Sequence, residues 1–157
     1  MTEHTEIIEK VRTLPDQIAG EVEGLSEAEL RRRPAEGAWS IKEVCGHLRD
    51  DSEVWRRRLQ MMITQADAAL PAYDQEALVR ERAYQDADIA GVLGDFRRFR
   101  LEMVEALTAL GPDGWVRTGQ HPDWGAMTIQ EGMERMVRHT EGHLDQVREL
   151  RGKVHAG

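Results

Sequence analysis

Apolar residues recur every three or four positions along four long stretches of this chain, and this spacing constrains the fold more than any other feature. The stretches cover about residues 3–24, 41–64, 87–110 and 129–151. A repeat of this period marks one face of a helix, whereas the β-branched and aromatic clusters typical of strands are few. Each helix must bury its apolar stripe against other helices. The sequence therefore predicts an all-α fold, a four-helix bundle.

Each stretch has its own predicted buried stripe. Pro15, inside the first stretch, is expected to kink that helix or to restart it, because proline removes a backbone hydrogen bond and clashes with the preceding turn. The four stripes are Ile7, Val11, Leu14, Ile18 and Val22; Ile41, Val44, Leu48, Trp55, Leu59 and Met62; Ile89, Leu93, Phe96, Leu101, Val104 and Leu107; and Ile129, Met133, Met136, Val147 and Leu150.

Local signals mark where helices begin. Ser40 with Glu43, and Thr128 with Glu131, have the S/T-x-x-E form of a capping box, in which the two side chains satisfy each other's free backbone amides. Long helices should therefore begin at these two places. Shorter helices are expected from Ser26 to before Pro34 and over about 75–81. A long aperiodic loop, over about 112–127, is expected as the rim of a pocket.

Composition excludes several classes of protein. The formal net charge is −8, and the Arg-rich stretches 31–33 and 56–58 are interleaved with acids, so we expect no nucleic-acid partner and no membrane partner. Cys45 is the single cysteine, which excludes an intramolecular disulfide and indicates a reducing compartment. The N-terminus lacks the apolar core of a signal peptide, and no apolar run is long enough to span a bilayer. We expect one cytoplasmic domain over residues 1–157.

Three histidines are candidate metal ligands. His139 and His143 are four residues apart, which places them one above the other on a helix, on the flank of its buried stripe. His47 lies about 100° from the centre of the stripe of the second helix, at the border between core and solvent. Three imidazoles that converge there would suit a catalytic metal with an open coordination position. Neutral imidazoles bind Zn, Ni, Fe, Co or Cu, and the sequence does not choose among them.

A second interpretation of these histidines stays open at this point. A half-buried histidine is often a hydrogen-bonded packing residue, and periodicity alone does not bring His47 to the other two. His121, in the predicted loop, is either a further ligand or an exposed loop residue, and we favour the second.

Polar residues one turn from the candidate ligands could orient the imidazoles or a bound water. These candidates are Asp50 and Asp51, beyond His47, and Gln146, beyond His143.

Two other reactive side chains are not expected to take part in the candidate site. Cys45 lies about 200° around its helix from His47 and is predicted to be a small packing residue. Glu141 projects about 200° from His139, which argues against the H-E-x-x-H arrangement of metalloproteases.

Glycines and tryptophans near these positions have two interpretations each. Gly46 and Gly142 directly precede candidate ligands, and a mid-helix glycine costs about 1 kcal/mol relative to alanine. They indicate either close backbone approach or room for a substrate beside the site, or else ordinary helix packing. The tryptophans could line an apolar pocket, and the first two are equally expected in the core: Trp39, Trp55, Trp115 and Trp124.

Two runs of residues resemble the DinB superfamily, specifically its YfiT-type members. The first, similar to the family pattern L..rP..g.WS..e...HL.D, is Leu30, Pro34, Gly37, Trp39-Ser40, Glu43, His47-Leu48 and Asp50. The second, similar to hp..G..T...........H...Hl.Q, is His121-Pro122, Gly125, Thr128, His139, His143-Leu144 and Gln146. The resemblance covers nearly the whole chain in the right order. Many relatives carry an additional histidine where this chain has Gly142.

The resemblance implies a four-helix bundle, often a homodimer, whose three histidines bind a divalent metal at the mouth of a pocket. On this basis the metal ligands are His47, His139 and His143, and Zn, Ni or Fe is the expected ion. In the wider superfamily some members are thiol S-transferases or a mycothiol-dependent isomerase. A small-molecule substrate and a low-molecular-weight thiol as cosubstrate are therefore expected.

Two classes of function are compatible with these expectations. The first is a metal-dependent enzyme, with thiol S-transfer favoured by the resemblance and metal-assisted hydrolysis next. The second is a non-catalytic metal-binding or stress-response module. A fourth protein ligand would indicate a structural metal, and we find none in the sequence.

Overall fold

Four long helices form a bundle in this computed structural model, which describes residues 2–156 and the side chains of residues 2–154. The helices are α1 (Glu3–Val22), α3 (Ile41–Thr64), α5 (Ile89–Thr108) and α7 (Ile129–Ala156). They match the four predicted stretches within a few residues. The predicted all-α four-helix bundle is confirmed, with an additional small sheet.

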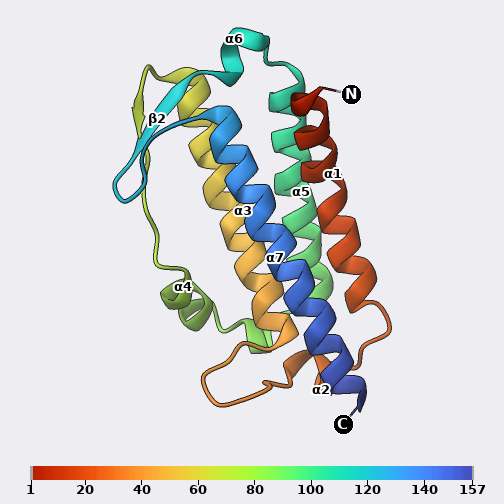
Figure 1. Cartoon of the computed structure of the whole chain (residues 1–157). Coiled ribbons are helices and arrows are strands. Elements are labelled where there is room, and N and C mark those ends of the chain that lie inside the picture. Colours follow the sequence, from red (N-terminus) through yellow and green to blue (C-terminus); the bar gives the residue numbers. More distant parts are fainter. Residues whose placement is uncertain (1, 157) are drawn as a thin grey trace.

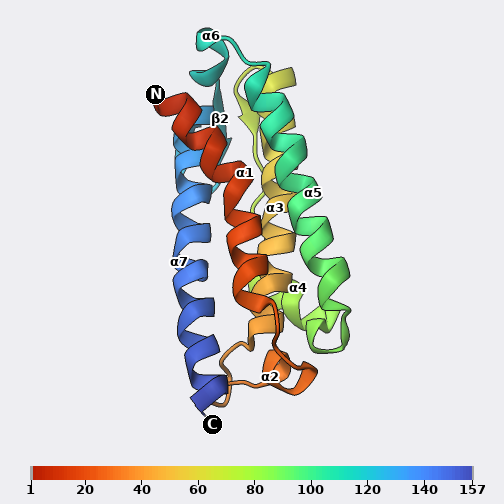
Figure 2. The same cartoon turned by 90° about the vertical axis from the view of Figure 1, so that its right-hand side faces the viewer.

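The four long helices pack in a ring whose order differs from their order in the chain. α1 packs against α5 and α7, and α3 packs against α5 and, less extensively, against α7. Figures 1 and 2 show α1 and α7 running in one direction and α3 and α5 in the other. Consecutive long helices α1 and α3, and likewise α5 and α7, therefore lie diagonally across the bundle. This explains why long connections with their own short helices join them.

The connecting segments contain three short α-helices and one 3-10 turn. They are α2 (Glu27–Arg31), α4 (Gln75–Arg82), η1 (Tyr84–Asp86) and α6 (Pro112–Trp115). The predicted helices after Ser26 and over 75–81 are confirmed. α1 runs through Pro15 as one element, so the expected restart does not occur.

Both predicted capping boxes are present. At the start of α3, the Glu43 amide donates to Ser40 Oγ at 3.2 Å and the Ser40 amide donates to Glu43 Oε1 at 3.1 Å. At the start of α7, the Glu131 amide donates to Thr128 Oγ1 at 3.1 Å and the Thr128 amide donates to Glu131 Oε1 at 3.0 Å. The two helices that carry the candidate ligands therefore begin at positions fixed by local sequence.

The prediction of an aperiodic loop over 112–127 is wrong in detail. This stretch forms α6 and a hairpin of β2 (Thr118–His121) and β3 (Gly125–Thr128), and β2 also pairs in parallel with β1 (Ala68–Ala69). The strands are two to four residues long, too short to show a period of two in the sequence. In Figure 1 the sheet lies beside the end where α3 finishes and α7 begins.

The predicted buried stripes hold for three of the four helices. All the stripe residues of α1, α3 and α7 are buried. On α5 the buried face is rotated by about one position: Val92, Phe99 and Met103 are buried, whereas Leu93 and Val104 are only partly so. Arg100 occupies the middle of the true stripe, and a charged residue there hid the apolar period.

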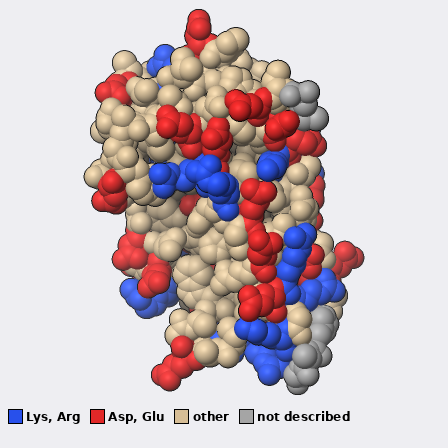
Figure 3. All heavy atoms as spheres, in the orientation of Figure 1, with Lys and Arg blue, Asp and Glu red and all other residues tan. Residues whose placement is uncertain are grey.

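Charges are mixed on the surface. Figure 3 shows Lys and Arg side chains interleaved with Asp and Glu on one face of the molecule. Among the described residues, no helix combines the length and the apolar character that crossing a membrane requires.

Candidate metal centre

Three imidazoles from two helices converge inside the bundle. His139 Nε2 lies 3.2 Å from His47 Nε2 and 3.1 Å from His143 Nε2. The three rings meet edge to face, with planes 70° to 87° apart, so their nitrogen edges point at one small region. The structure thus places together the three histidines that the sequence singled out.

His47 is more deeply buried than its helical position predicted. Its exposed fraction is 0%, whereas the side chain of His139 is 34% exposed. The expected place at the border of the core is therefore wrong for His47, because α7 covers it and the Trp39 ring lies 5.1 Å from its own. The site has a closed side at His47 and an accessible side at His139.

Neighbouring groups fix which nitrogen of two histidines carries the proton. Gln146 Oε1 lies 2.7 Å from His143 Nδ1, and an amide oxygen can only accept, so Nδ1 holds the hydrogen. Asp51 Oδ2 lies 3.3 Å from His139 Nδ1 and has the same effect. The Nε2 atoms of both rings therefore present lone pairs to the same region.

The contact between Asp51 and His139 is not well aligned as a hydrogen bond, but a carboxylate at 3.3 Å still favours the hydrogen on His139 Nδ1. Both atoms are buried without a well-directed partner, while the other Asp51 oxygen accepts from the Tyr73 hydroxyl at 2.8 Å. Burial alone would raise the pKa of the Asp51 carboxyl, but His139, His47 and Tyr73 hold that pKa below its usual value. Asp51 is therefore an anion beside the site at neutral pH.

Burial also keeps two of the imidazoles uncharged. It lowers the pKa of His47 to about 3, and burial together with the neighbouring His139 lowers the pKa of His143. A neutral imidazole has the lone pair that a metal requires.

The geometry fits one divalent ion. At a metal–nitrogen distance of about 2.0–2.1 Å, two ligands of a tetrahedral centre stand about 3.3 Å apart, close to the separations of His139 Nε2 from His47 Nε2 and from His143 Nε2. All three ligand atoms lie within 4.8 Å of one another, and among the described residues no Cys, Asp, Glu or further His joins them as a fourth ligand. Such a centre would leave a coordination position free for chemistry.

A cavity of about 420 Å³ opens beside the histidines. His139 and Asp51 lie at its wall together with Tyr73, His121 and Trp124. His121 is only 5% exposed and stacks on Trp124 at 3.8 Å between ring centroids, so the preferred expectation of an exposed loop residue is wrong. The predicted pocket rim is real, because the β2–β3 hairpin forms part of this wall.

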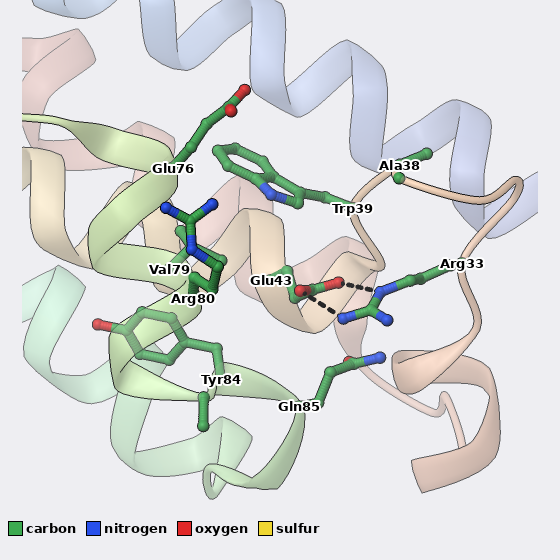
Figure 4. Close-up of a pocket in the computed structure, with 11 residues that line it drawn as sticks. Arg33, Ala38, Trp39, Glu43, Glu76, Val79, Arg80, Tyr84 and Gln85 are labelled. Atoms are coloured by element: carbon green, nitrogen blue, oxygen red, sulfur yellow. Dashed lines mark hydrogen bonds and ion pairs between the residues drawn. The ribbon is translucent and has the colours of Figure 1, made fainter.

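A second cavity, of about 480 Å³, lies next to Trp39. Figure 4 shows Trp39 above the ion pair of Arg33 and Glu43, with Arg80 of α4 facing it. The Arg33 guanidinium donates to both Glu43 oxygens, at 2.8 and 2.9 Å. Since the Trp39 ring also contacts His47, this tryptophan stands between the second cavity and the histidines.

The three residues predicted to orient the imidazoles differ in what they contact. Asp51 contacts His139 and Gln146 contacts His143, as described above. Asp50 is engaged elsewhere: its Oδ1 accepts from the Tyr84 hydroxyl at 2.5 Å and from Arg49 and Arg82. Asp50 points a full 100° away from Asp51 on α3, and it anchors α4 and η1 rather than the site.

Other residues behave as the sequence predicted. Cys45 is fully buried, and burial raises the pKa of its thiol to about 12, so it is a packing residue. Glu141 lies on the surface and pairs with Lys10 at 3.3 Å, away from the histidines.

Sequence reasoning missed several residues of the cavity, among them Tyr73, Arg58 and Arg135. Tyr73 lies between β1 and α4, where no periodic pattern exists. Arg58 is only 1% exposed although it belongs to an arginine run that predicts a solvated face. Its position 11 residues after His47, three helical turns along the same side of α3, is the signal that could have identified it.

Several known proteins have sequences similar to that of this chain. "Putative metal-dependent hydrolase YfiT" of Bacillus subtilis (strain 168) is 23% identical over 91% of this chain and 81% of its own length. "Putative metal-dependent hydrolase OB0782" of Oceanobacillus iheyensis is 24% identical over 92% of this chain and 84% of its own length.

Solved structures share the fold. YfiT from Bacillus subtilis superposes with a TM-score of 0.89 at 22% identity, covering 96% of this chain and 86% of YfiT. The mycothiol-dependent maleylpyruvate isomerase superposes with a TM-score of 0.71 at 12% identity, covering 92% of this chain and 62% of the isomerase.

The family assignment follows from the extent of the match. The sequence model that describes the DinB superfamily matches residues 11–147, a span that begins in α1 and ends in α7 and includes all three histidines. This chain is therefore a member of the DinB superfamily.

Proposed function

We propose that this protein is a metal-dependent enzyme in which His47, His139 and His143 hold one divalent ion, with Zn, Ni or Fe expected. The observation that carries the proposal is the convergence of the three Nε2 atoms, two of them with lone pairs fixed by Asp51 and Gln146. Three protein ligands and an adjoining cavity are typical of catalytic rather than structural metal sites.

The protein's own groups prepare this centre. Asp51 and Gln146 hold two imidazoles in the orientation a metal needs, and Tyr73 holds Asp51 in turn. A divalent ion bound there would lower the pKa of a thiol or a water that reaches it and so supply a nucleophile at neutral pH.

We favour a small thiol over water as the nucleophile. Asp51, the carboxylate that contacts the histidines, lies on the Nδ1 side of His139 and is also bonded to Tyr73, so it is poorly placed to take a proton from a water at the Nε2 side. A thiol, with a pKa of about 8.5, needs less help to ionise. Its sulfur would form a bond to an electrophilic carbon of the small-molecule substrate. The leaving group would depart with the electron pair of the broken bond, and the thiol proton would pass to solvent.

Hydrolysis is the second candidate. The names of the two relatives, metal-dependent hydrolases, favour it, and some metal sites activate water without an adjacent carboxylate base.

The metal is tested first. Protein stripped with a chelator and reloaded with Zn, Ni or Fe is analysed for bound metal, beside His143→Gln and the control His121→Gln. His143 contributes a ligand atom, whereas His121 lines the same cavity outside the cluster. We expect one ion per chain in the wild type and the control, and much less in His143→Gln. Equal retention in all three proteins would remove the proposal.

The reaction is tested next. Metal-loaded protein is incubated with cysteine or glutathione and monochlorobimane, and separately with 4-nitrophenyl acetate. Faster thioether formation than with free metal alone supports thiol transfer. Acceleration of the ester alone supports hydrolysis. If neither reaction is accelerated with these or a wider substrate panel, the non-catalytic metal-binding module is the better description.

Three further parts of the proposal rest on sequence expectation or family resemblance alone. These are a homodimer, a cytoplasmic location and a single domain over residues 1–157. Light scattering of the purified full chain tests the first, because a mass near twice the 17.9 kDa of one chain is expected.

A further inference from the structure

The wall of the 420 Å³ cavity is both aromatic and cationic. Trp55, Tyr73 and Trp124 provide flat apolar surface, and Arg58 of α3 and Arg135 of α7 provide guanidinium groups. The Arg58 guanidinium carbon lies 4.8, 5.9 and 5.5 Å from the centroids of these three rings. The positive charge is therefore placed within the aromatic surface rather than at its edge.

Arg58 has hydrogen-bonding capacity to spare. Its Nε and Nη2 both donate to the Pro71 carbonyl, at 3.1 and 2.7 Å, and Nη2 also lies 3.4 Å from His121 Nε2. No described residue accepts a bond from Nη1. Nη1 of Arg58 is not fully buried, in contrast to Nη1 of Arg100, which is buried and has no partner. Nη1 of Arg58 is therefore reachable from the cavity although the side chain as a whole is 1% exposed.

Neither arginine of the cavity is neutralised by an ion pair. Within the described residues, no carboxylate oxygen lies within 4.0 Å of a guanidinium nitrogen of Arg58 or Arg135. Arg135 is exposed, and its guanidinium carbon lies 4.1 Å from the centroid of the Trp124 ring, so the charged group itself is held on the aromatic surface. The Asp51 carboxylate offsets the burial of Arg58 only in part, from beyond ion-pair distance, and the pKa of the guanidinium stays below its ordinary value. Such burial is costly, which indicates that a further anion completes the site.

We propose that this cavity binds a small substrate that combines a flat unsaturated body with a carboxylate. The body would pack against Trp55, Tyr73 and Trp124, and the carboxylate would accept hydrogen bonds from Arg58 and Arg135. Guanidinium groups match a carboxylate better than any other side chain does, because their N–H donors are coplanar. A volume of about 420 Å³ suits a ligand of this size.

The acidic residues of the wall restrict where the carboxylate can lie. Asp51 is bonded to Tyr73 and contacts His139, at the histidine end of the cavity. Asp123 lies in the turn of the hairpin, and its backbone amide donates to His121. The anionic group of the ligand therefore belongs beside Arg58 and Arg135, which leaves the other end of the ligand towards the histidines.

This inference rests on the proposed function, since it names the substrate class of the same site. It is tested on metal-free full-length protein at pH 8, so that neither the ion nor a protonated imidazole contributes to binding. The probes are benzoate, its neutral analogue benzamide, and acetate, which has the charge without the ring. Affinity is measured by calorimetry and by quenching of tryptophan fluorescence.

We expect benzoate to bind with a dissociation constant of about 1 mM or lower, and benzamide and acetate at least about 10-fold more weakly. Arg135→Gln should weaken benzoate about 5-fold or more and benzamide much less, because Arg135 is exposed and only benzoate carries a charge for its guanidinium to bind. The matched control is Arg138→Gln, an exposed arginine on α7 that lines a different groove, and it should bind benzoate as the wild type does.

Equal affinities for benzoate and benzamide, or equal losses in the Arg135→Gln and Arg138→Gln variants, would overturn the inference. Arg58→Gln should abolish the preference for benzoate, and if it fails to fold, the Arg135→Gln comparison still decides. Selective benzoate binding by a protein that retains no metal would support the anion site and remove the proposed function. One bound ion per chain without a preference for benzoate would do the reverse.

Discussion

Two adjacent aspartates on α3 have different tasks, and the difference comes from their angle on the helix. Asp51 faces His139 and Tyr73, whereas Asp50 faces Tyr84 and the arginines around it. Both are almost fully buried, at 4% and 2% exposed. Substitutions at these two positions can therefore distinguish effects on metal binding from effects on the stability of the fold.

We predict that Asp51→Asn weakens metal binding about 10- to 100-fold, because the carboxylate that orients His139 and raises its basicity is lost. Asp50→Asn should retain the affinity of the wild type and lower the free energy of unfolding by about 1–3 kcal/mol, since it weakens a buried charged network. Metal affinity is measured by competition with a chromophoric chelator, and stability by urea denaturation of the metal-free proteins. Equal metal affinities in the two variants would contradict the role given to Asp51.

At the scale of elements, a glycine lets η1 approach α3. A Cβ atom on Gly46 would lie 2.2 Å from carbons of the Tyr84 ring, whereas one on Gly142 would meet nothing within 4 Å. Tyr84 cannot retreat freely, because its hydroxyl is bonded to Asp50 at 2.5 Å. Of the two interpretations for glycines beside candidate ligands, close packing explains Gly46, and nothing in the structure explains Gly142.

Gly46→Ala is therefore expected to lower the free energy of unfolding by about 1–3 kcal/mol through overpacking, in spite of the better helix propensity of alanine. Gly142→Ala, on the exposed face of α7, should raise it by about 0.5–1 kcal/mol. Chemical denaturation of the two metal-free variants beside the wild type measures both changes. A Gly46→Ala protein as stable as Gly142→Ala would show that Tyr84 does not hold its place.

The sequence predicts where the long helices lie better than it predicts which side chains of other elements pack against them. Apolar periodicity and capping boxes locate α1, α3, α5 and α7, because these signals are local. The stripe of α5 was misplaced because Arg100 sits inside the core, where Ser52 and Thr140 accept its hydrogen bonds at 2.8 and 2.6 Å. Such partners come from other helices and leave no mark in the α5 sequence.

The candidate site shows the same division. The i,i+4 spacing puts His139 and His143 on one face, but periodicity gives His47 an angle and not a neighbour, so only the family resemblance connected it to the pair. Tyr73 was missed because it contributes through a contact with Asp51 that spans 22 positions. The β1–β2 pairing was missed for the same reason: it joins residues about 50 positions apart.

For the whole molecule, an ion held by α3 and α7 would be a cross-link between two helices that pack less extensively on each other than α3 does on α5. We predict that metal at 100 times its dissociation constant stabilises the fold by about 2.7 kcal/mol. For a chain of this size that corresponds to a rise in Tm of about 5–10 °C. Thermal unfolding with and without metal checks this, and a similar rise in His143→Gln would show that the stabilising ion binds elsewhere.

The small sheet already connects α3 and α7, so a metal cross-link would be a second connection between these two helices. Strand β1 follows the end of α3, and the β2–β3 hairpin precedes the start of α7, so backbone hydrogen bonds join the two helices at one end of the bundle. An ion on the three histidines would join them again about 26 Å further along α3, counting from Thr64 back to His47 at about 1.5 Å per residue. Two helices linked at a single point can change the angle between them more easily than two helices linked at two points. Metal loading would thus add a second link between α3 and α7 and narrow the range of widths open to the cavity that lies between the two links.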